Sequence, residues 1–326
     1  MAHKTSKQRD SSFDFVKGLL IYLVVWGHVM VAGDKMGGDA VFNIIYSFHM
    51  PLFIFLSGYF AVHTLQKSIG ECFEKVWNRL FCPALIWSGV MLVIFWLKGY
   101  ERGLGSMLVD SLRSVWFLYC LASLYVLGCI VFKVKRWKYV VAILLAALGY
   151  AIYKIPGVVY IEYFQPIRQW PLFVMGFAYR EYKHKFESRP LRWTVVIVSM
   201  VAYVGLVLWL VSNHPIEYIR SHENYLLRAV IHQTGAVAWF AVFSLLYFGI
   251  EKLARGGKFI AKLGCNTMGV YVIHGKILLL TILLLPSNIF GTVPYCITAA
   301  ILTWLSYMVT TLVKKSPPVA KYILGE

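Results

Sequence analysis

The sequence predicts an all-α protein that crosses a membrane several times. Hydrophobic residues make up 59% of its 326 residues and charged residues only 14%, whereas a soluble domain is about half apolar and a quarter charged. The apolar residues are gathered in long runs, as membrane-spanning helices require. Tyrosine and tryptophan are frequent at the ends of these runs, where a bilayer has its interfaces. We expect one domain over residues 1–326.

The runs approach the ~20 residues that a helix needs to cross a bilayer, so we expect about ten transmembrane helices. The fifth and sixth runs are short, and either can be a tilted, broken or re-entrant helix. In chain order the runs are 15–33, 41–62, 81–97, 114–132, 139–153, 167–180, 193–212, 225–250, 263–285 and 292–313.

The distribution of basic residues predicts which side of the membrane each connection faces. If the N-terminus lies in the cytoplasm, the cytoplasmic segments hold 22 of the 32 lysine and arginine residues, and the opposite side holds eight. Basic residues concentrate in the cytoplasmic loops of membrane proteins, so we predict that both termini face the cytoplasm. The same rule accounts for the net charge of +17. We therefore predict contact with the lipid bilayer and no nucleic-acid partner.

The six cysteines do not form a recognisable framework. No two of them make a CxxC motif, and most lie in or near apolar runs. Buried thiols are common packing groups, so we expect reduced cysteines rather than disulfides. The sequence has no HExxH motif either, and we predict no bound metal.

The first run is FDFVKGLLIYLVVWGH from Phe13 to His28. It contains polar residues whose transfer into a bilayer costs free energy. Ionisable groups inside a bilayer mark functional sites. Lys17 and His28 are eleven positions apart, which is about three helical turns, so both lie on one face, ~16 Å apart along the axis. Asp14 is three residues before Lys17 and can pair with it. Taken alone, Lys17 can equally be a side chain that snorkels to the interface.

Three later runs also contain a histidine, namely His49, His232 and His274. A rise of ~1.5 Å per residue places these imidazoles and that of His28 ~16–20 Å from the cytoplasmic edge of a ~30 Å slab. A single histidine in a helix is more often a hydrogen-bonded packing residue, but four at one depth predict a shared polar chamber. Pro51 bends the second run near His49, and irregular backbone at membrane depth is tolerated where it lines a cavity.

These residues belong to motifs whose order resembles that of the acyltransferase family 3 membrane proteins. The leading motif is a basic residue, ten intervening residues and a histidine, which Lys17 and His28 match. One such motif is a weak signal, but four more follow in the family's order along the length of the chain. They are FHMPLFIFLSGY at 48–59, WNRLFCPALIW with Arg79 and Pro83, VWFLYCLASLY at 115–125, and LGCNTMGVYVIHG at 263–275, where Thr267 replaces a more common serine.

The resemblance implies a membrane O-acetyltransferase of the bacterial cytoplasmic membrane. Members of this family acylate surface polysaccharides, lipopolysaccharide and other glycans. The implied donor is an acyl-CoA, usually acetyl-CoA, that binds from the cytoplasm, and the implied acceptor is a hydroxyl of a cell-surface glycan or lipid-linked sugar. Cationic side chains suit the phosphates of CoA. The expected donor-binding residues are therefore Lys17 with Asp14, and Arg79.

The expected chemistry centres on His28. A neutral imidazole at this position can take a proton from the attacking hydroxyl, or it can carry the acyl group transiently. His49, Tyr271 and His274 are expected to orient His28 or to stabilise the oxyanion. Lys276 is a further candidate, although it lies ~200° around the helix from His274.

Two other functions are compatible with polar residues inside a membrane. A transporter or flippase of a glycan or lipid-linked sugar also needs such residues, but the internal repeat usual in transporters is not evident in this sequence. A membrane sensor or assembly protein can keep the same fold without catalysis. A serine hydrolase is disfavoured because the sequence has no G-x-S-x-G motif.

Overall fold

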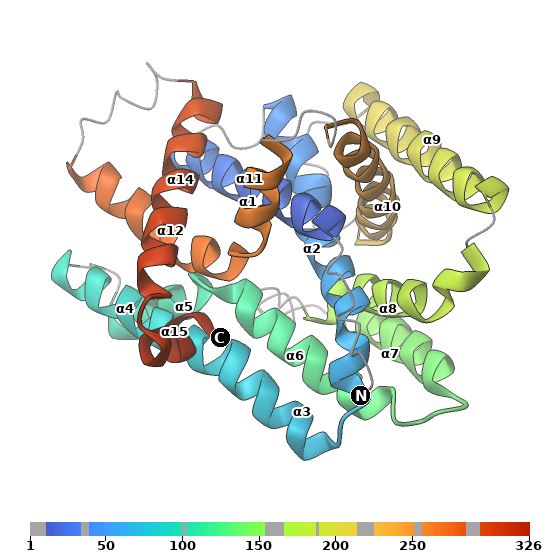
Figure 1. Cartoon of the computed structure of the whole chain (residues 1–326), viewed down its shortest axis with the longest axis horizontal. Helices are drawn as coiled ribbons and strands as arrows, with labels where there is room; N and C mark the ends of the chain where they lie inside the picture. The colour runs from blue at the N-terminus through green and yellow to red at the C-terminus, as the bar shows by residue number, and fades with distance from the viewer. Residues whose placement is uncertain are drawn as a thin grey trace, which may run out of the picture.

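The computed structural model describes residues 11–33, 39–99, 101, 103–153, 166–186, 189–213, 225–250, 256–284 and 294–326. Within these ranges every regular element is a helix, as the sequence predicts (Figure 1). The predicted cytoplasmic N-terminal tail and the predicted outer connection at 214–224 lie outside the described residues.

Each of the ten predicted runs falls on an α-helix of the described structure. Short helices lie between them, and one segment, η1, is a π-helix. The elements are α1 (Ser11–Ala32), α2 (Ala40–Leu65), α3 (Ile69–Val76), η1 (Trp77–Phe81), α4 (Cys82–Leu97), α5 (Leu104–Arg113), α6 (Trp116–Val131), α7 (Lys138–Tyr153), α8 (Pro166–Tyr182), the 3-10 helix η3 (Lys183–Phe186), α9 (Arg189–Asn213), α10 (Tyr225–Ile250), α11 (Gly256–Gly264), α12 (Thr267–Leu284), α14 (Tyr295–Val313) and α15 (Pro317–Leu324).

The described helices form a multi-pass membrane protein. Five segments are long and apolar enough to cross a bilayer: α1, α2, the continuous α3–α4 segment, most of α10, and α14. Two bent pairs qualify when each is counted as one span, which gives up to seven. The bend between α5 and α6 is 67°, and that between α11 and α12 is 84°. Length and composition therefore support five to seven spans among the described helices, and the count of about ten stays a prediction.

Helix α2 packs closely against α8. Two glycines permit the contact: a Cβ on Gly58 would lie 2.8 Å from the carbonyl carbon of Phe173, and a Cβ on Gly176 would lie 2.8 Å from that of Phe55. Small residues matter here because lipid is as apolar as leucine, so membrane helices associate largely through close backbone packing. This contact holds α2, and with it His49, in a fixed position.

Two further glycines bring α11 against the start of α1. A Cβ on Gly18 would lie 2.9 Å from the carbonyl carbon of Ile260, and a Cβ on Gly264 would lie 2.6 Å from that of Asp14. The chain then turns by 84° into α12, which also contacts α1. The bend between α11 and α12 therefore brings the late part of the chain to the helix that carries His28.

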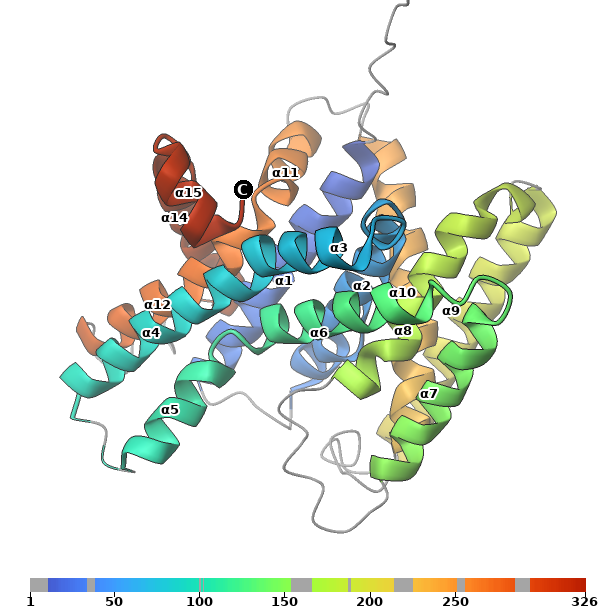
Figure 2. The ribbon, with the colours of Figure 1, turned by 90° about the horizontal axis from the view of Figure 1, so that it is seen from below.

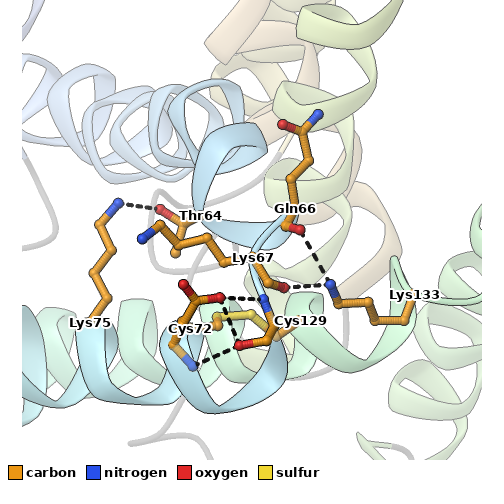
Figure 3. Close-up of a disulfide and its surroundings, with 9 residues drawn as sticks. Thr64, Gln66, Lys67, Cys72, Lys75, Cys129 and Lys133 are labelled. Carbon is orange, nitrogen blue, oxygen red and sulfur yellow. Dashed lines mark hydrogen bonds between the residues drawn. A yellow bond between two sulfur atoms is a disulfide. The ribbon is translucent and has the colours of Figure 1, made fainter.

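The prediction that all cysteines are reduced is wrong for two of them. Cys72 on α3 and Cys129 on α6 form a disulfide, although 57 residues separate them (Figure 3). Figures 1 and 2 show α6 beside α3, and the two helices contact each other. No local motif marks this pair, because it depends on how the two helices pack. The cysteines outside the disulfide are Cys82, Cys120, Cys265 and Cys296.

Two lysines connect the segments around the disulfide. The Nζ of Lys75 donates a hydrogen bond of 2.8 Å to the hydroxyl of Thr64 (Figure 3). The Nζ of Lys133, just after α6, donates to the backbone carbonyls of Gln66 and Lys67. The end of α2 is thus tied to α3, and the turn that follows α2 is tied to the end of α6.

Candidate functional site

His28 and His274 form a hydrogen-bonded pair between α1 and α12. The Nδ1 atom of His28 lies 2.7 Å from the Nε2 atom of His274. The two rings are stacked, with centroids 4.9 Å apart and planes inclined by 19°. His274 is buried, at 2% exposure, whereas His28 is only partly buried. His28 is therefore the more accessible member of the pair.

The partners of His274 assign the protons in a neutral pair. The Nδ1 atom of His274 lies 2.9 Å from the carbonyl oxygen of Val270. A carbonyl only accepts, so Nδ1 of His274 must donate, and its Nε2 must accept the N–H of His28. In neutral His28 the proton is then on Nδ1, and Nε2 carries a lone pair. The pair thus presents His28 Nε2 as a base or nucleophile, with His274 as the residue that orients it.

His49 on α2 has the same local arrangement. Its Nδ1 atom lies 2.5 Å from the carbonyl oxygen of Ile45, one turn earlier, so its Nε2 atom is also the acceptor in the neutral ring. His49 is 3% exposed and His232 is 5% exposed. His49 is close enough to interact electrostatically with His28 and with His232. A hydrogen bond thus links His274 to His28, and electrostatic interactions link His28 to His49 and His49 to His232.

A cavity of about 230 Å³ lies between α1, α2, α6 and α12, and we call it the cleft. Its lining is mostly apolar, with a few polar side chains. The residues that matter below are Lys17, Val24, Phe53, Leu80, Tyr125 and Tyr271. On α1, Lys17, Ile21 and Val24 line one side, which is the face on which the sequence places both Lys17 and His28.

The cleft leads from Lys17 towards the histidines. Its lining residues Val24, Phe53 and Tyr271 lie four, four and three positions from His28, His49 and His274 respectively. Three or four residues make one helical turn, so His28 and His274 follow one turn beyond the lining. His49 is next to Met50, which also lines the cleft. Three separate helices thus place an imidazole near the same end of the cleft.

Lys17 lies at the other end and pairs with Asp14. Its Nζ atom is 2.6 Å from Oδ1 of Asp14, and the side chains are 21% and 6% exposed. The same ammonium lies 5.5 Å from the ring centroid of Phe60. Lys17 therefore combines a fixed position with partial exposure. An ammonium group has three N–H donors, so the ion pair leaves donors for an anionic ligand.

Arg79 occupies the exposed face of η1 and does not itself line the cleft. Its neighbour Leu80 does, and Arg79 is close enough to interact electrostatically with Tyr125 of the lining. Lys75 interacts with Arg79 in the same way. We call Lys17, Lys75 and Arg79 the basic rim. The sequence analysis missed Lys75, although its spacing of four residues from Arg79 is a helical signal.

Tyr271 and Lys276 hold different positions on α12. The hydroxyl of Tyr271 accepts a hydrogen bond of 3.3 Å from the backbone N–H of Phe117, so its own hydrogen can still be donated. Lys276 is 8% exposed, and its ammonium lies 5.4 Å from the ring centroid of Trp87 on α4. Tyr271 faces the cleft, whereas Lys276 faces α4.

The fold and the site define a multi-pass membrane protein with a basic rim, a cleft and a histidine pair in which one imidazole can accept a proton. The chain belongs to acyltransferase family 3, because the family model for this acyltransferase domain matches residues 10–313. It is therefore a membrane acyltransferase. Among the described residues, no three or more His, Cys, Asp or Glu side chains are grouped so that they could hold a metal ion.

Two relatives of the chain share one name. The nodulation protein NolL of Mesorhizobium japonicum is 26% identical over 301 residues, which cover 83% of this chain and 77% of that protein. The nodulation protein NolL of Sinorhizobium fredii is 26% identical over 311 residues, which cover 85% of this chain and 80% of that protein. No solved structure matches the chain.

Proposed function

We propose that the protein moves an acetyl group from cytoplasmic acetyl-CoA to a hydroxyl of a cell-surface or lipid-linked glycan, and that His28 is the reacting side chain. The observation that carries the proposal is the His28–His274 hydrogen bond of 2.7 Å, located one turn beyond a cleft that begins at Lys17. A basic group for the donor and an imidazole for the chemistry thus lie at the two ends of one passage.

Acetyl-CoA would bind with its phosphates at the basic rim and its thioester towards His28. The phosphates of CoA bind the basic rim of Lys17, Lys75 and Arg79 through charge-assisted hydrogen bonds. The flexible thioester arm then lies in the cleft, among its apolar side chains. Lys17 and His28 are eleven positions apart on α1, which is ~16 Å along the helix axis. An extended arm places its carbonyl carbon at His28.

In the general-base route, the acceptor hydroxyl oxygen attacks the thioester carbonyl carbon while Nε2 of His28 takes the hydroxyl proton. The carbonyl oxygen becomes an oxyanion, for which the Tyr271 hydroxyl is the nearby donor. Neutral His49 uses its N–H on the carbonyl oxygen of Ile45, so it has no second donor for the oxyanion. When the carbonyl re-forms, the carbon–sulfur bond breaks and the CoA thiolate leaves with the proton from His28. The products are an O-acetyl ester and CoA, so the reaction consumes no other reagent.

In the acyl-carrier route, Nε2 of His28 attacks the thioester carbonyl carbon, the carbon–sulfur bond breaks and the CoA thiolate leaves. The acceptor hydroxyl then attacks the acetyl carbon on His28, the carbon–nitrogen bond breaks and the hydroxyl proton passes to the thiolate, which gives the O-acetyl ester, CoA and free His28. Incubation with radiolabelled acetyl-CoA without acceptor distinguishes the routes. Protein-bound label that hydroxylamine removes, and that His28→Gln abolishes, identifies a carrier. Absence of such label, together with transfer when acceptor is added, identifies a base.

The proposal includes an arrangement in the membrane. The chain forms one domain with about ten spans around a polar chamber, and it lies in the bacterial cytoplasmic membrane with both termini inside. The 22 basic residues on the predicted cytoplasmic side support this orientation. The succession of His274, His28, His49 and His232 supports a shared chamber.

The decisive test compares the surface glycans of a deletion strain with those of strains that express the wild-type protein or His28→Gln. Mass spectrometry should find an acetyl group of ~42 Da that only the wild-type protein restores. A glycan that reaches the surface unacetylated supports transfer chemistry. If the glycan itself fails to reach the surface in the deletion strain, and His28→Gln restores its export, the protein is a transporter and the proposal is wrong.

A further inference from the structure

We propose that α15 and the glycine after it position Arg79 for the donor, so that Gly325 is a positioning residue for acyl-CoA binding. This inference rests on the proposed function, in which Arg79 contributes to the basic rim. Arg79 is exposed, and an exposed arginine contributes to binding only if its backbone is held in the right place. The contacts of α15 supply that restraint.

Gly325 touches the backbone of Arg79 directly. A Cβ on Gly325 would lie 2.8 Å from the Cα atom of Arg79 and 2.9 Å from its carbonyl carbon, and closer still to its carbonyl oxygen. Gly325 also has a φ angle of +67°, in the left-handed region that favours glycine. No other residue type satisfies both the backbone conformation and the close approach.

Further contacts fix α15 against α4. The indole N–H of Trp87 donates a hydrogen bond of 2.9 Å to the carbonyl oxygen of Ile323. Leu324 is 2% exposed, and Lys314 pairs with Glu326 at 2.5 Å. Figure 1 shows α15 against the line of helices formed by α3 and α4, and α15 contacts both α4 and η1. Gly325 is therefore held on both sides, by α15 before it and by the Lys314–Glu326 pair after it.

Arg79 needs such a restraint because of the helix type at its position. It lies in the π-helix Trp77–Phe81, between α3 and α4. A π-helix widens the turn and changes the direction in which its side chains point, and such segments are frequent at functional sites. The wider turn makes the direction of Arg79 sensitive to whatever packs on it. Gly325 is the residue that packs on its backbone.

The test replaces Gly325 with alanine and uses Gly99→Ala as the matched control. Gly99 has a φ angle of +68°, almost equal to that of Gly325, but a Cβ on it would meet no atom within 4 Å. Both substitutions therefore bring the same backbone strain, and only Gly325→Ala displaces Arg79. We expect Gly325→Ala to raise KM for acetyl-CoA about tenfold, the scale of a lost hydrogen bond to a charged group, with kcat little changed. Gly99→Ala should leave both unchanged.

A double-mutant comparison separates this inference from the proposed function. In an Arg79→Ala background, Gly325→Ala should add no further change in KM, because its effect passes through Arg79. If Arg79→Ala leaves KM unchanged, the donor-binding role of Arg79 is wrong. If Arg79→Ala raises KM but Gly325→Ala does not, the positioning role of Gly325 is wrong.

A second variant covers the case in which Gly325→Ala does not fold. Gly325→Asn adds the same Cβ, but asparagine tolerates the left-handed conformation better than alanine does. A folded Gly325→Asn protein, judged by size-exclusion chromatography and thermal unfolding, should show the same rise in KM. An unchanged KM in this folded variant overturns the proposal.

Discussion

The Nδ1 atom of His28 lies 2.7 Å from the Nε2 atom of His274, although 246 residues separate the two histidines in the chain. Neutral His274 donates its one N–H, on Nδ1, to the carbonyl oxygen of Val270, so its Nε2 accepts and neutral His28 must donate from Nδ1. This leaves a lone pair on Nε2 of His28, the atom that the proposed reaction uses.

The first prediction concerns His28 itself. His28→Gln and His28→Ala should lower kcat by ~10²–10⁴-fold, because neither side chain can act as a base or carry the acetyl group. Acetyl-CoA affinity and the unfolding temperature should change little, because neither substitution alters the basic rim. The measurement is acetyl transfer by purified, folded protein. Near-normal turnover in either variant would remove His28 from the chemistry and make His49 the next candidate.

The second prediction distinguishes the role of His274 from that of His28. His274→Phe removes the acceptor for the N–H of His28 and should lower kcat by ~10–100-fold, the range for groups that orient a metal-binding histidine. His274→Gln, whose amide oxygen can accept the same bond, should recover part of the activity. His63→Phe, at an exposed position on α2, is the control. A loss as large as that of His28→Gln would mean that His274 takes part directly.

The third prediction concerns the donor. Lys17→Ala should raise KM for acetyl-CoA with little effect on kcat, and Lys17→Arg should keep part of the affinity because it keeps the charge. Isothermal titration with acetyl-CoA in detergent checks this directly. The control is Lys258→Ala, which removes an exposed positive charge on α11. Equal affinity in the wild-type protein and Lys17→Ala would identify Lys17 as a snorkelling side chain only.

The fourth prediction concerns the disulfide. Cys72→Ala should lower the free energy of unfolding by ~2–4 kcal/mol, because it removes the link that constrains the unfolded chain. Cys82→Ala removes a thiol outside the disulfide and serves as the control. Thermal unfolding compares the variants. Alkylation of Cys72 in protein that is denatured without reductant would contradict the disulfide itself.

The fifth prediction concerns orientation. A cysteine introduced in 133–138 should react with a membrane-impermeant label only after the cell is opened, because basic loops favour the cytoplasmic side. The disulfide lies nearby, and Cys72 and Cys129 are 0% and 2% exposed. Disulfides are rare in the cytoplasm, so the proposed topology requires that the burial of both cysteines shields the bond from soluble reductants. Labelling of 133–138 in intact cells would show that the true topology is the opposite of the predicted one.

Features that depend on neighbours along the chain could be predicted from the amino-acid sequence alone. Helix type and position follow from apolar runs, and each of the ten runs falls on a helix. The shared face of Lys17 and His28 follows from helical periodicity alone, and Lys17, Ile21 and Val24 do line one side of the cleft. The motifs were sufficient to predict the family to which the chain belongs.

Which of these residues come into contact depends on the tertiary structure. The sequence grouped His49, Tyr271 and His274 as possible partners of His28, and only the packing of α12 against α1 gave His274 the direct hydrogen bond. The same holds for Cys72 with Cys129 and for Gly325 with Arg79. Periodicity fixes direction within one helix, whereas contacts between helices depend on bends, such as the 84° turn before α12, and on glycines that let backbones approach. Neither of these can be read from spacing along the chain.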